Sequence, residues 1–93
     1  MNLDLSNKGL SKIPNFNDIN VVKSYGFSSP SDIKELNLWN NQISKIENLD
    51  SLVNLQTLIL ETNRISKIEN LDSLVNLKSL NRSEEHTSEL QSR

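Results

Sequence analysis

The chain has 93 residues, of which 34% are hydrophobic and 4% aromatic, so its apolar side chains have to stand at regular positions if they are to build a core. Its formal net charge of −2, with acidic and basic residues interspersed, argues against nucleic acid or an anionic membrane as partner, and no apolar stretch approaches the roughly 18 residues that span a bilayer. The sequence contains no cysteine, which excludes disulfides, thiolate metal sites and cysteine nucleophiles and agrees with a cytoplasmic location.

The first residues have the pattern of a strand that leads into a turn. In Leu3-Asp4-Leu5-Ser6 the apolar residues alternate with polar ones, which is typical of a strand with one buried face. We therefore expect a strand near residues 3–6, with Asp4 and Ser6 pointing outward.

Residues 15–32 carry the signals of a short helix followed by a loop. Asn17 or Asp18 could cap the helix, Gly26 would end it, and residues 28–31 (SSPS) are expected to be loop. Three apolar residues of this helix are expected to face inward: Ile19, Val22 and Tyr25.

An identical internal repeat dominates the rest of the sequence. Residues 43–55 read ISKIENLDSLVNL, and residues 65–77 read the same thirteen letters, at an offset of 22. A Leu-x-Leu pair stands before each copy. We therefore expect two further strands, near residues 35–39 and 57–61, with their leucines on the buried face.

The period changes from two to three after each Leu-x-Leu pair. Apolar residues recur at every third position from Ile43 to Leu55, which predicts a 3₁₀-like or loosely helical return segment with one apolar edge. Asn41 and Asn63 lie where the chain turns away from the strand, and we interpret them as a structural ladder whose amides satisfy buried backbone groups. Because Lys8 stands at this position in the first unit, we expect the ladder to be broken there.

These residues carry a family resemblance. The pattern Leu36-x-Leu38-x-x-Asn41-x-Ile43 and its recurrence after 22 residues resemble the leucine-rich repeat, and the repeat length is similar to that of a regulatory subunit of protein phosphatase 1. The resemblance covers about residues 1–81. It implies an α/β fold, a right-handed leucine-rich repeat solenoid of about three repeats, with short parallel strands on the concave face and 3₁₀ or irregular segments on the convex side.

The repeat spacing also predicts the domain organisation. Leu3 and Leu36 are 33 residues apart, 11 more than the later repeat length, so the first unit carries an insertion within residues 15–32. We expect a leucine-rich repeat fragment over residues 1–81, with units at about 1–32, 33–54, 55–76 and the start of another at 77–81.

The repeat register stops after Asn81. Residues 82–92 (RSEEHTSELQS) have no apolar periodicity and resemble the in-frame translation of a sequencing-library adaptor. We interpret residues 82–93 as a disordered, non-native tail, and the repeats as a fragment of a longer protein. The tail contains the one histidine of the chain, His86.

The sequence offers little for catalysis or metal binding. Without cysteine, or histidine outside the tail, residues 1–81 cannot form a Ser-His-Asp, Cys-His or His-based metal site. Carboxylates stack one repeat apart and could in principle form acid pairs, but lysines stack beside them, which is typical of a solvated convex surface. We expect no enzyme activity, no cofactor and no metal. The stacked residues are Glu47 with Glu69, Asp50 with Asp72, and Lys45 with Lys67.

The concave face is the candidate binding site, because the residues between the leucines point outward there. Trp39 and Ile59 interrupt an otherwise polar surface on adjacent strands, and exposed aromatic residues are enriched among binding hot spots. The alternative is that Trp39 only covers neighbouring side chains. The predicted partner-binding residues are Glu35, Asn37, Trp39, Thr57, Ile59 and Glu61, and the other outward positions are Asp4, Ser6, Ser79 and Asn81.

These observations favour a non-enzymatic scaffold that binds another protein, whose identity the sequence does not reveal. Two narrower alternatives follow from the 22-residue repeat length: a regulatory subunit of a protein phosphatase, and a repeat segment of a bacterial surface or secreted adhesin. An enzymatic role would need a catalytic domain outside residues 1–81.

Overall fold

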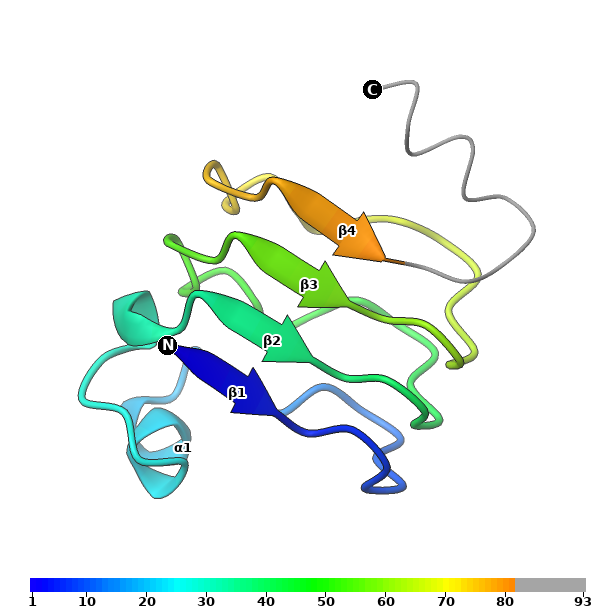
Figure 1. The fold of residues 1–93 in the computed structure, drawn as a ribbon, viewed down its shortest axis with the longest axis horizontal. Coiled ribbons are helices and arrows are strands. Elements are labelled where there is room, and N and C mark those ends of the chain that lie inside the picture. Colours follow the sequence, from blue (N-terminus) through cyan, green and yellow to red (C-terminus); the bar gives the residue numbers. More distant parts are fainter. Residues whose placement is uncertain (82–93) are drawn as a thin grey trace.

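The computed structural model describes residues 1–81, and the interpretation of residues 82–93 as a tail lies outside this part of the chain. Its strands form one parallel sheet in the order in which they occur along the chain (Figure 1). The strands are β1 (Asn2–Asp4), β2 (Glu35–Asn37), β3 (Thr57–Ile59) and β4 (Ser79–Asn81).

The strand register follows the repeat spacing. Leu36 pairs with Leu3 on one side and with Leu58 on the other, and Leu58 pairs in turn with Leu80. Equivalent residues of successive repeats therefore lie side by side. This parallel arrangement fits an α/β repeat fold.

The strands are shorter than expected at their C-terminal ends. Parallel bonds continue beyond them, from the N–H of Leu38 to the carbonyl of Ile59 (2.9 Å) and from the N–H of Leu60 to that of Asn81 (2.7 Å). Asn40 and Thr62 then have positive φ, 59° and 60°, which turns the chain away from the sheet. The assigned strands therefore end at Asn37 and Ile59, although parallel backbone bonds continue as far as the N–H groups of Asn40 and Leu60.

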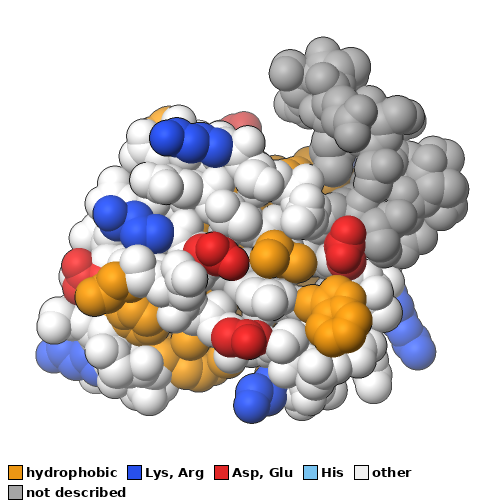
Figure 2. Space-filling model, in the orientation of Figure 1, with side chains coloured by type: hydrophobic (Ala, Val, Ile, Leu, Met, Phe, Trp, Pro, Cys, Tyr) orange, Lys and Arg blue, Asp and Glu red, His pale blue; other side chains and the backbone are white. Residues whose placement is uncertain are grey.

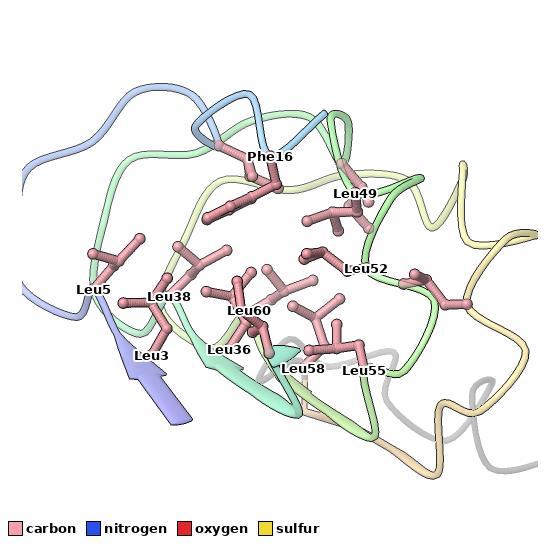
Figure 3. Close-up of a cluster of buried hydrophobic side chains, with 14 of the residues drawn as sticks. Leu3, Leu5, Phe16, Leu36, Leu38, Leu49, Leu52, Leu55, Leu58 and Leu60 are labelled. Atoms are coloured by element: carbon pink, nitrogen blue, oxygen red, sulfur yellow. The ribbon is translucent and has the colours of Figure 1, made fainter. Parts of the chain in front are cut away.

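The core lies between the sheet and the return segments. The strand leucines point toward the apolar residues of the return segments. Figure 3 shows this for Leu36 and Leu58, which face Leu52 and Leu55. All four of these side chains are fully buried. The leucines of each repeat thus belong to one continuous core that they share with the leucines of the neighbouring repeats.

The return segment of residues 43–55 has the predicted apolar edge. It contains separate turns, closed by bonds from the N–H of Leu52 to the carbonyl of Leu49 and from the N–H of Leu55 to that of Leu52, both 3.0 Å. These are the i to i+3 bonds of a 3₁₀ turn, but they do not join into a helix. The residues that form the apolar edge are all buried: Ile43, Ile46, Leu49, Leu52 and Leu55.

The insertion forms the predicted helix α1 (Ile19–Ser24), capped by Asp18, whose carboxylate accepts the N–H of Asn20 at 2.9 Å. Val22 is buried as expected, and Gly26, with φ of 93°, follows the helix end.

The prediction that Ile19 faces inward is wrong. Its side chain is 42% exposed, because Phe16, just before the helix, takes the core position and is fully buried. The ring of Phe16 lies 5.9 Å from that of Tyr25, which is half-buried against the core as predicted. Phe16 was not expected in the core because it precedes the helical pattern.

The expected loop at residues 28–31 is partly helical. Pro30–Asp32 form a short 3₁₀ helix, η1, and Ser29 caps it by accepting the N–H of Ser31 on its hydroxyl at 3.3 Å. Proline fits the first position of a helix because it lacks an N–H that would be left unpaired there. Among residues 1–81, neither helix has the length and apolar character needed to cross a bilayer.

Phe16 provides a test of the insertion's structural role. Phe16→Ala should lower the free energy of unfolding by about 3 kcal/mol or more, because it removes a fully buried ring, as followed by urea denaturation. Ile19→Ala on the same insertion should change it by no more than about 0.5 kcal/mol. Equal effects of the two substitutions would show that the insertion does not pack as described.

Candidate functional site

The side of the sheet that faces away from the core is built from the residues between the buried leucines, and we call it the outer sheet face. The strand register arranges its residues in rows that cross the sheet. One row contains Asn2, Glu35, Thr57 and Ser79, the next contains Asp4, Asn37, Ile59 and Asn81, and Ser6, Trp39 and Glu61 lie just beyond the strands.

The six predicted partner-binding residues lie together on β2, β3 and the two residues that follow each strand. Glu35 pairs with Thr57 and Asn37 with Ile59, in strands about 4.8 Å apart. Five of the six side chains are half-buried, and that of Trp39 is 41% exposed. Trp39 is therefore the main apolar group that this face presents to solvent.

Hydrogen bonds hold the backbone of Trp39 in place. Its N–H donates to the side-chain oxygen of Asn37 at 3.0 Å, and its carbonyl accepts the N–H of Asn7 at 3.0 Å. The N–H of the next residue, Asn40, donates to the carbonyl of Glu61, which follows the neighbouring strand β3, also at 3.0 Å. The indole is thus a large apolar group on a backbone that is already fixed, so its burial by a partner requires little ordering.

The outer sheet face carries negative charge. Asp4, Glu35 and Glu61 belong to it, and none of its residues named above is lysine or arginine. The hydroxyl and the N–H of Ser6 donate to Asp4 at 2.6 and 2.9 Å, and these bonds lower the pKa of that carboxyl below its usual value. Figure 2 shows acidic side chains around the apolar ones in the middle of this face and basic side chains toward its edges.

Asn41 ties two successive repeats together. Its amide nitrogen donates to the carbonyls of Leu5 and Leu38, and its side-chain oxygen accepts the N–H groups of Lys8 and Leu10, each at 3.0 Å. The side chain is 7% exposed, so these bonds replace contacts with water that the buried turn cannot make.

Asn63 occupies the equivalent place one repeat later. Its amide nitrogen donates to the carbonyls of Leu38 (2.8 Å) and Leu60 (3.0 Å), and its oxygen accepts the N–H of Ile43 at 3.0 Å. Each asparagine therefore bonds to the backbone of its own repeat and to that of the repeat before it. The backbone N–H of Lys8 is bound by Asn41, so the lysine does not leave this turn unsatisfied.

Two further rows of asparagines were not predicted from the sequence. Asn48 and Asn70 have positive φ, 67° and 60°, and their amides donate to the carbonyls of Ile13 (3.0 Å) and Ile46 (2.7 Å) in the preceding repeat. The third row is Asn54, which donates to Ser31 at 3.1 Å, and Asn76, which donates to Val53 at 3.0 Å. Their recurrence at an offset of 22 was the signal that could have revealed them.

The stacked carboxylates belong to the return segments, away from the outer sheet face. A carboxylate oxygen of Glu69 lies 3.5 Å from the ammonium of Lys67. In this ion pair the lysine side chain is largely exposed to solvent. Asp50 and Asp72 are exposed. Over residues 1–81, no group of three or more histidine, cysteine, aspartate or glutamate residues could hold a metal ion.

The middle of the chain matches a known protein family. Residues 32–73 match the family described as leucine-rich repeats (2 copies). The match supports a leucine-rich repeat protein. It covers β2, β3, the return segment of residues 43–55 and the first part of residues 65–77. Leucine-rich repeats generally mediate protein–protein interaction. Comparisons with curated proteins and with solved structures gave no match.

The ladder residue Asn41 can be tested by substitution. Asn41→Ala should lower the free energy of unfolding by about 3 kcal/mol or more, because backbone groups in a buried turn lose their partners. Asn76→Ala, which removes an exposed amide, should cost less than about 1 kcal/mol. Urea denaturation of both variants measures the difference, and a loss below about 1 kcal/mol for Asn41→Ala would contradict the role of the ladder.

Proposed function

We propose that this chain is a non-enzymatic module that binds another protein through the outer sheet face. The observation that carries this proposal is the exposed indole of Trp39, on a fixed backbone and one strand away from Ile59. Apolar anchors surrounded by polar groups are typical of the centre of a protein–protein interface. The general role of leucine-rich repeats supports the same assignment.

The charge of this face favours a basic partner surface. Asp4, Glu35 and Glu61 surround the apolar centre, and hydrogen bonding lowers the pKa of Asp4, which favours its ionised form. A partner that places an apolar side chain against Trp39 and lysine or arginine around it would match both features. In this proposal the module acts in the cytoplasm.

A regulatory subunit of a protein phosphatase is a narrower candidate, favoured by the 22-residue repeat length alone. Retention of a phosphatase catalytic subunit on the immobilised chain would support it. A surface or secreted adhesin rests on the same repeat length, and a signal peptide encoded upstream of Met1 would favour that alternative.

The proposed function predicts that binding needs the apolar residues of the outer sheet face and does not need those of other surfaces. Trp39→Ala combined with Ile59→Ala should reduce retention of partners on the immobilised chain at least tenfold, since hot-spot residues contribute about 2 kcal/mol or more each. The readout is quantitative mass spectrometry of the retained proteins, with circular dichroism to verify folding.

The matched control is Val53→Ala combined with Val75→Ala. These valines are also exposed, at 41% and 78%, but they belong to the return segments. This control should retain the partners of the unchanged chain. Equal retention by the Trp39 and Ile59 variant would overturn the assignment of the outer sheet face.

A further inference from the structure

A carboxylate stands beside the exposed indole on the outer sheet face. The N–H of Leu38 donates to the carbonyl of Ile59 at 2.9 Å, and that of Asn40 donates to the carbonyl of Glu61 at 3.0 Å. These bonds continue the pairing of β2 with β3 through Trp39 and Glu61. Because adjacent strands are about 4.8 Å apart, the indole and the carboxylate are neighbours.

Neither of these two groups has a cationic partner in the described part of the chain. Among residues 1–81 the one ion pair joins Lys67 to Glu69, so the half-buried carboxylate of Glu61 has no lysine or arginine on it there. The same residues contain no cation–π contact at Trp39, whose side chain is 41% exposed. Both groups are therefore available to a cation that a partner brings.

The other two acidic residues of this face are placed differently. Ser6 lies beside Trp39 on the β1 side, and its hydroxyl and N–H donate to Asp4 at 2.6 and 2.9 Å, so hydrogen bonds within the chain already occupy this carboxylate. Glu35 stands four residues before Trp39 on β2, roughly 13 Å along the strand. Glu61 is thus the acidic residue that combines a position next to the indole with a carboxylate that lacks an internal partner.

An indole and a carboxylate side by side match the chemistry of arginine. A guanidinium is planar, so it can stack on the ring while two of its N–H groups donate to the carboxylate, whereas a lysine ammonium offers only a compact charge. The arginine stem is apolar and can lie along apolar surface, which Ile59 provides two residues before Glu61 on the same face. The arrangement therefore favours arginine over lysine.

We infer that Trp39 and Glu61 form a binding site for one arginine side chain of the partner. This inference rests on the proposed function, and it narrows the basic partner surface to one residue type at one position. The guanidinium lies against the indole and donates to the carboxylate of Glu61, and its stem contacts Ile59. The rest of the indole stays open to an apolar side chain of the same partner.

Three peptides test this site on the 93-residue chain. Hexa-arginine is the probe, hexalysine carries the same charge without the planar group, and hexacitrulline keeps the planar group without the charge. The emission of Trp39, the one tryptophan of the sequence, reports binding, and calorimetry gives the affinity. Hexa-arginine should bind at least about fivefold more tightly than hexalysine, and hexacitrulline should not bind measurably.

A matched pair of substitutions separates the site from the charge of the whole face. Glu61→Gln and Glu35→Gln each remove one negative charge from the outer sheet face. Glu61→Gln should weaken hexa-arginine binding at least about fivefold, because the guanidinium loses its carboxylate, whereas Glu35→Gln should weaken it less than about twofold. Equal losses would show that the peptide responds only to overall charge, and the arginine site would then be wrong.

Substitutions of the indole test the stacking contact. Trp39→Leu keeps an apolar side chain but removes the aromatic face, so calorimetry should find hexa-arginine and hexalysine bound with similar affinity. Trp39→Tyr keeps an aromatic ring and should preserve most of the preference for arginine. A preference that persists in Trp39→Leu would contradict the role of the indole.

The peptide titrations and the retention of whole partners test different claims. Loss of partner retention by the Trp39 and Ile59 variant, together with equal affinities for hexa-arginine and hexalysine, would overturn the arginine site and leave the proposed function in place. Absence of hexa-arginine binding would also overturn the site. Unchanged retention by that variant would remove the proposed function and, with it, this inference.

Discussion

A repeat of 22 residues is too short to enclose its own leucines, and this constraint shapes the whole molecule. A three-residue strand such as β2 has two lateral edges, and its leucine needs apolar neighbours on both sides. Leu36 is fully buried because Leu3 and Leu58 flank it, whereas Leu80, beside only one described strand, is half-buried. Burial therefore depends on position in the stack more than on local sequence.

The same stacking creates a polar requirement that the asparagines meet. Each turn away from the sheet brings backbone N–H and carbonyl groups into a poorly solvated place, and an asparagine side chain both donates and accepts there. Asn41 and Asn63 do so beside the strands. Asn48 and Asn70 donate to carbonyls on the return path while adopting positive φ, which asparagine tolerates well. Thr62 adopts a similar φ of 60° with a branched side chain, and so departs from this pattern.

Periodicity and the repeat offset predicted the strands, their register and the residues of the outer sheet face, because these features follow directly from spacing along the chain. The insertion was harder to predict. Whether Phe16 or Ile19 fills the core depends on how a two-turn helix lies against distant leucines, which local pattern does not encode. The identity of the protein that binds at Trp39 also could not be predicted. An exposed indole indicates an apolar contact but does not specify which protein makes it.

The most direct test of the dependence of each repeat on its neighbours is amide hydrogen exchange across residues 1–81. The N–H groups of Leu38 and Leu60 donate to the following strands. The account predicts that the N–H of Leu38, deep in the stack, exchanges at least about tenfold more slowly than that of Leu80 in β4, with Leu60 between them. Uniform protection from β1 to β4 would contradict it, because the last strand would then be as stable as strands covered on both sides.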